Sequence, residues 1–163
     1  MKKYLDLLHT HGATEALVTS AADIVVADWT IMKCLYGCPN YGHNRCCPPY
    51  TPGADRMRRI LAEYTTAIIF SCPRMEAVTP AALAAAKALA ADGRYKALAF
   101  GAGPCRLCPK CTPDACPRPA DTAPSPEACG IDVIATARRA GIAIDIPPRP
   151  SAPLTCIGLL LVE

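Results

Sequence analysis

Four cysteines lie close together in residues 103–119, GPCRLCPKCTPDACPRP. Cys105, Cys108, Cys111 and Cys116 follow the spacing C-x2-C-x2-C-x4-C, with proline directly after the last. A zinc site usually takes two well-separated pairs of ligands, because four donors must crowd around one small ion. A [4Fe–4S] cluster is larger, and a short loop can bring three cysteines to its iron corners. The ferredoxin run is one residue shorter, so this spacing favours iron–sulfur chemistry but leaves the ferredoxin assignment of ligands open.

A second cysteine-rich stretch spans residues 33–49, KCLYGCPNYGHNRCCPP, and contains Cys34, Cys38, Cys46 and Cys47. We call residues 33–49 the first cysteine loop and residues 103–119 the second cysteine loop. Prolines follow several of the cysteines and stiffen the backbone around them, which favours preorganised ligands. Basic residues within two positions of the candidate ligands would favour thiolates over thiols. These residues are Lys33, Arg45, Arg106, Lys110 and Arg118.

The cysteine content also bears on the cellular compartment. The chain has 11 cysteines, an odd number, and its first residues, MKKYLDLLHTHG, lack the pattern of a secretory signal. We therefore expect a cytoplasmic protein. In that reducing environment, cysteines are more often metal ligands or redox groups than disulfide partners.

Composition narrows the class of protein further. A chain of 163 residues with 52% hydrophobic and 19% charged residues is expected to form one compact domain, residues 1–163. The net charge of +3 is too small to indicate a nucleic-acid partner. No stretch approaches the roughly 20 apolar residues of a membrane span. We expect neither a nucleic-acid nor a membrane partner, and the sequence leaves the oligomeric state open.

Apolar runs alternate with helical patterns along the chain. Strands are predicted at 23–32, 65–70, 96–103 and 157–163, with weaker candidates at 16–20 and 142–146. Helices are predicted at 2–10, from Thr51–Pro52, from Thr79–Pro80 to Gly93, and from Ser125–Pro126 to Gly141. This alternation predicts an α/β fold with a mostly parallel sheet flanked by helices. Each cysteine loop directly follows a predicted strand, so both should lie at one edge of that sheet.

The motifs in combination resemble those of a family of small prokaryotic proteins of unknown function, described only as predicted metal-binding. The resemblance rests on KCLYGCPNYG, CPP, GPCRLCPKC and PSPEACGIDV, and it runs from about Lys33 to the C-terminal IGLLLVE. It implies a metal but no reaction. The family's cysteines correspond to Cys34, Cys38, Cys47, Cys105, Cys108, Cys111 and Cys116, which we take as the candidate metal and cofactor ligands.

Seven ligands are one short of the eight that two fully ligated [4Fe–4S] clusters need. Cys46 or Cys72 would supply the eighth, and Cys72 is favoured because it follows a predicted strand and precedes a proline. Alternatively, one cluster has three cysteine ligands and an open iron corner. Cys129 and Cys156 fall in helix and strand patterns and are interpreted as small buried hydrophobes.

These patterns predict an iron–sulfur protein with one or two [4Fe–4S] clusters that transfers electrons to a partner redox enzyme. The first alternative is a structural zinc-binding module for protein interaction. The second is an enzyme that works at an open-corner cluster. We find no pairing of a nucleophile with a base, so the sequence leaves open whether the protein is an enzyme.

Overall fold

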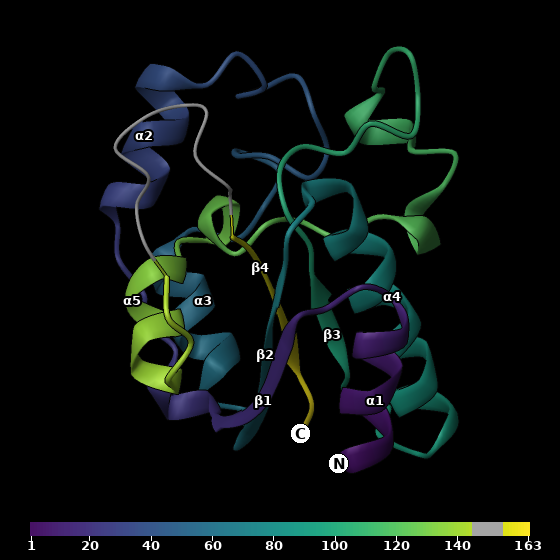
Figure 1. The fold of residues 1–163 in the computed structure, drawn as a ribbon. Helices are drawn as coiled ribbons and strands as arrows, with labels where there is room; N and C mark the ends of the chain where they lie inside the picture. Colours follow the sequence, from purple (N-terminus) through teal and green to yellow (C-terminus); the bar gives the residue numbers. More distant parts are fainter. Residues whose placement is uncertain (145–154) are drawn as a thin grey trace.

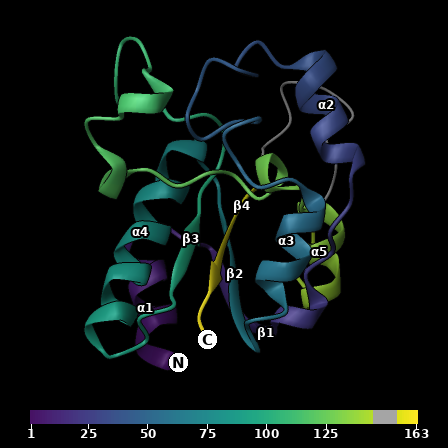
Figure 2. The same cartoon turned by 180° about the vertical axis from the view of Figure 1, so that it is seen from behind.

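The computed structural model describes residues 1–144 and 155–163. Its centre is a four-stranded sheet in the order β1-β2-β4-β3, formed by Glu15–Ser20, Thr66–Cys72, Cys156–Leu161 and Leu98–Phe100 respectively. Helices cover both faces (Figure 1). Helices α1 (Lys2–Thr10) and α4 (Met75–Ala91) lie on one face, and α3 (Ala54–Leu61) and α5 (Val133–Ala140) lie on the other, as the reverse view also shows (Figure 2).

The prediction of a mostly parallel sheet is wrong, because every neighbouring pair of strands in this sheet is antiparallel. The alternation of strands and helices did capture one feature: β2 and β3 run in the same direction, joined by α4. The final strand, β4, lies between them and runs the opposite way. An apolar run predicts a buried strand but carries no information on its neighbour, and here the neighbour comes from the other end of the chain.

Alternating side chains of the buried strands give the described residues an apolar core in two layers. Ile68 and Phe70 of β2 pack with α1 and α4, whereas Ala67 and Ile69 pack with α3 and α5. These four residues are completely buried, which explains why β2 reads as a continuous apolar run in the sequence.

One predicted helix has the expected ends, and two others begin at different residues than predicted. The helix at 2–10 is confirmed as α1, and α3 begins at Ala54, just after the expected cap. Helix α4 begins at Met75, one turn before Thr79, and therefore contains Pro80 in its interior. Val78 in this added turn is completely buried in the core layer beside β2. Tertiary packing thus extends the helix beyond the local start pattern at Thr79–Pro80.

The predicted helix from Ser125 is divided in two. A short 3-10 helix, η4 (Glu127–Cys129), ends at Gly130, whose φ is 81°, and α5 follows with Asp132 as its N-cap. A Cβ atom at Gly130 would lie 2.8 Å from Cα of Ala54, so the break fits the close approach of α3. Three further 3-10 helices are η1 (Ala21–Asp23), η2 (Pro113–Ala115) and η3 (Pro119–Asp121).

Residues 23–32 do not form the predicted strand. Only Val26 makes a bridge, to Ile131, and helix α2 begins at Trp29 and ends at Gly37. Cys34 therefore lies in the last turn of a helix. The weaker strand at 16–20 is confirmed as part of β1. The other weak candidate, at 142–146, extends beyond the described residues from position 145 onward.

Within residues 1–144 and 155–163, every helix is too short or too polar to cross a lipid bilayer.

Candidate metal centre

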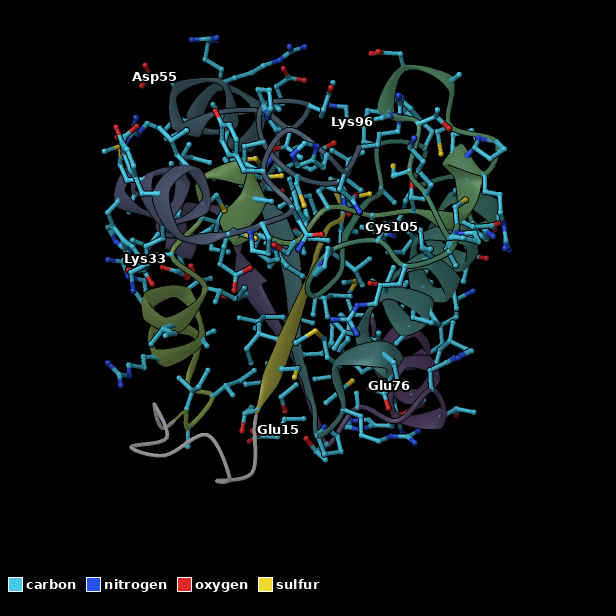
Figure 3. The ribbon with its side chains drawn as sticks, turned by 90° about the horizontal axis from the view of Figure 1, so that it is seen from above. Glu15, Lys33, Asp55, Glu76, Lys96 and Cys105 are labelled. Atoms are coloured by element: carbon cyan, nitrogen blue, oxygen red, sulfur yellow. The ribbon has the colours of Figure 1, made fainter. Side chains whose placement is uncertain are left out.

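The two cysteine loops meet at one end of the sheet, where β2 and β3 end and β4 begins (Figure 1). The first loop leads from α2 to α3, and the second follows β3. Viewed from above this end, sulfur atoms gather around the loops near Cys105 (Figure 3). Residues that are about 70 positions apart in the sequence are thereby brought together.

Asn44 and Arg45 join the two loops through hydrogen bonds. The Asn44 side chain donates its amide N–H to the carbonyl oxygen of Cys105, at 2.8 Å. The backbone N–H of Arg45 donates to Sγ of Cys111 at 3.4 Å, and its guanidinium donates to the carbonyl oxygen of Pro113 at 2.7 Å. Because two of these bonds end on backbone carbonyls of the second loop, they fix its path relative to the first.

Cys46 lies with the cysteines of the second loop. It lines a small pocket together with all four of them: Cys105, Cys108, Cys111 and Cys116. The side chain of Cys46 is only 4% exposed, and its backbone N–H donates to Oδ1 of Asn44 at 3.0 Å. Burial first, and then the neighbouring thiol of Cys105, raise the pKa of Cys46 to about 11.

The remaining cysteines of the first loop form a second group around Cys47. Burial, followed by the nearby thiols of Cys38, Cys46 and Cys34, raises the pKa of Cys47 to about 12. Cys38 is the C-cap residue of helix α2 and donates its backbone N–H to the carbonyl oxygen of Cys34 at 3.3 Å, which sets the spacing of these two cysteines. Cys111 lines the small pocket with Cys46 and also makes a small contribution to the raised pKa of Cys47.

The donor set consists of sulfur atoms and is crowded. Desolvated thiols next to one another resist ionisation, so several thiolates at this site require a compensating positive charge. A metal supplies that charge and deprotonates the cysteines that bind it. In the part of the chain that the structure describes, no three His, Cys, Asp or Glu side chains are already arranged around a single ion. The donors are sulfur atoms, whose chemistry fits a thiophilic metal.

The other three cysteines lie outside the two loops, although the thiol of Cys46 contributes to the raised pKa of Cys129. Cys72 ends β2, faces Cys156 of β4 in the sheet register, and is completely buried in the core layer beside α4. Cys129 is completely buried in η4 and belongs to the opposite core layer. The predicted burial is confirmed for Cys129, whereas Cys156 is only partly buried and packs against the core layer beside α4. The sequence favoured Cys72 over Cys46 because Cys72 follows a strand and precedes a proline. Neither feature determines the direction in which the side chain of Cys72 points.

Asn44 is a site residue that the sequence did not reveal. An asparagine in a loop rich in glycine and proline is most often a turn residue. Here Asn44 is only 5% exposed and bonds both Cys46 and Cys105. The adjacency of Asn44 to Cys46 was visible in the sequence, but its link to the second loop requires the tertiary structure.

Comparison with known proteins gives one match. Residues 18–162 match the family of predicted metal-binding proteins DUF2284. Neither the curated proteins nor the solved structures contain a match. The match covers most of the chain and contains both cysteine loops, which confirms the resemblance seen in the motifs. The chain therefore belongs to the DUF2284 family of predicted metal-binding proteins.

Proposed function

We propose that the protein binds two [4Fe–4S] clusters and transfers electrons to a partner redox protein. The observation that carries this proposal is the contact between the two cysteine loops, which gathers eight cysteines at one end of the sheet. Eight thiolates are the number that two such clusters require.

The cysteines divide between the proposed clusters as the structure groups them. One cluster takes Cys34, Cys38 and Cys47, and the other takes Cys46 with cysteines of the second loop. Counting Cys111 with the first group gives each proposed cluster four cysteines and a total of eight. Cys46 thus replaces Cys72 as the favoured eighth ligand, because Cys72 is buried within the apolar core.

Neighbouring groups would adjust the properties of bound clusters. Hydrogen bonds to ligand sulfurs and positive charges stabilise the more negative, reduced state and so raise the reduction potential. The backbone N–H of Arg45 makes such a bond to Cys111. The amide of Asn40 approaches the sulfur of Cys38 at 3.8 Å and adds a weaker contact of the same kind.

The surface of α2 supports docking of a partner protein close to the proposed clusters. Trp29, Met32, Leu35 and Tyr36 are all more than 40% exposed on this short helix. The same helix carries Cys34, and Cys38 follows it directly. Large exposed apolar side chains grouped on one helix are typical of an interaction surface. A partner bound there would be close to the first group of cysteines, which favours electron transfer over a short distance.

The test is metal and sulfide analysis of protein purified without oxygen. The proposal predicts about eight irons and about eight acid-labile sulfides per chain, and an EPR signal after reduction. Zinc without sulfide would replace the proposal with the structural zinc module. Free thiols without any metal would contradict both.

A further inference from the structure

We infer that a cavity beside the second cysteine loop binds a small organic anion with an apolar body. The cavity has a volume of about 560 Å³ and lies between α4 and residues 102–107 of the loop. This volume is within the range of small-molecule sites, roughly 300–1,000 Å³. Cys105 lines both this cavity and the small pocket of cysteines, so a molecule bound here is adjacent to the candidate metal centre.

The cavity gives a reason for the unusual composition of α4. One face of the helix, with Val78, Ala81 and Leu89, is completely buried in the core. An ordinary surface helix would carry mostly polar residues on its opposite face. Instead, α4 places Pro80, Leu83 and Ala84 toward the cavity, where Leu107 from the loop joins them. These side chains form an apolar floor that suits the hydrocarbon part of a ligand.

Two glycines hold the loop against α4 and thereby define the cavity wall. A Cβ atom at Gly101 would overlap the hydroxyl of Thr79, and one at Gly103 would lie 2.6 Å from Sδ of Met75. Gly103 also has a φ of 68°, which favours glycine. The backbone N–H of Ala102 donates to Oγ1 of Thr79 at 3.4 Å. The position of the wall therefore depends on the close approach of the backbone at Gly101 and Gly103 to side chains of α4.

The charges around the cavity favour an anion. Its lining includes Lys87, Arg106 and Arg118, against the carboxylates of Glu76 and Asp121. Asp121 is shared, since it lies 3.2 Å from Arg118 and 3.9 Å from Lys87.

Three further features favour an anion in this cavity. Glu76 is already paired with Arg74, at 3.8 Å. Arg106 forms no ion pair within residues 1–144 and 155–163, so its guanidinium is available for bidentate bonding to a carboxylate or phosphate. The first turn of α4, which also borders the cavity, adds the positive end of the helix dipole.

The first experiment measures binding of hexanoate to the purified protein with whatever metal it carries, by saturation-transfer NMR and calorimetry. Hexanamide has the same body without the charge, and acetate has the charge without the body. Hexanoate is expected to bind roughly tenfold more tightly than either, because it alone uses both the cations and the apolar floor. Failure of hexanoate to bind, or equal binding of hexanoate and hexanamide, overturns the inference.

Variants then place the binding in this cavity. Arg106→Gln is expected to weaken hexanoate roughly tenfold and to leave hexanamide unchanged. Arg139→Gln is the matched control, because Arg139 is exposed on α5 at the other face of the sheet. Ala84→Phe should fill the cavity and abolish binding, whereas Ala90→Phe, at an exposed position of the same helix, should not. Equal effects within either pair overturn the inference.

The result is independent of the proposed function. Hexanoate binding by a protein that contains zinc or no metal would keep this inference and reject the iron–sulfur proposal. An iron–sulfur protein that does not bind hexanoate would keep the iron–sulfur proposal and reject this inference.

Discussion

Asn44 shows how a single side chain can position two potential ligands. Burial of an amide is unfavourable unless its donor and acceptor are both bonded. Asn44 meets this condition by donating to the backbone of Cys105 and accepting from the backbone of Cys46. The two cysteines are thereby held at the same small pocket, where the thiol of Cys105 contributes to the raised pKa of Cys46.

At this scale the prediction concerns Cys46 and Cys72. Cys46→Ala should remove a ligand, change the EPR spectrum of the reduced protein, and lower its iron content by up to about half. Cys72→Ala is the matched control, since it also removes a buried sulfur but from the apolar core. Its iron content should stay at the wild-type level. Iron analysis and EPR spectroscopy of both variants, prepared without oxygen, test this prediction. The assignment of Cys46 is wrong if Cys46→Ala keeps the full cluster content or if both variants lose equal amounts.

Strand β4 determines the character of the sheet. It lies between β2 and β3 and pairs antiparallel with both, so strands that run in the same direction are not neighbours. Its central residue, Gly158, faces Phe70 of β2 and Val78 of α4. In the sequence this glycine only interrupts an apolar run. In the structure it leaves the space that the phenyl ring of Phe70 occupies.

Gly158→Ala should therefore destabilise the fold. The added Cβ would overlap the ring of Phe70 and lie 2.7 Å from Cγ1 of Val78, both completely buried. Overpacking of this kind costs about 1–3 kcal/mol in unfolding free energy. Gly53→Ala is the control, because Gly53 precedes α3 with a φ of −73° and a Cβ there meets no described atom within 4 Å. Urea denaturation of both variants tests this. Equal stabilities would show that the core adjusts around β4 without cost.

The whole molecule separates its stabilising core from its candidate site. Both core layers are formed by the sheet and by the helices on its faces. Of the described residues in the two cysteine loops, Asn44, Cys46, Cys47 and Pro48 are buried, and none of them belongs to either layer. The loops instead depend on mutual hydrogen bonds and, in our proposal, on a shared metal centre.

Removal of the metal should consequently affect the loops more than the fold. After chelation under reducing conditions, far-UV circular dichroism is expected to retain most of the helix and sheet signal. Limited proteolysis should become much faster within residues 103–119, because metal binding is coupled to ordering of the ligand loops. Peptide mapping of early fragments locates the cuts. Global loss of the dichroism signal, or unchanged protection of the loop, would contradict this separation.

The sequence by itself determined the features that depend on neighbouring residues. The spacing of Cys105, Cys108 and Cys111 predicted a metal-binding loop, and apolar runs predicted β2 and β4. Helix α1 was also predicted with its observed bounds. Local geometry decides these features, since short cysteine spacing limits which metals can be bound and side-chain periodicity reflects burial.

Only the tertiary structure decided the features that depend on distant parts of the chain. The position of β4 between β2 and β3 made the sheet antiparallel. Packing against Ile131 replaced the predicted strand at 23–32 by a single bridge followed by α2. The contact of Asn44 with the second loop placed Cys46, rather than Cys72, beside the other cysteines. Periodicity and spacing specify burial and reach, but which segments become neighbours is set by the packing of the whole chain.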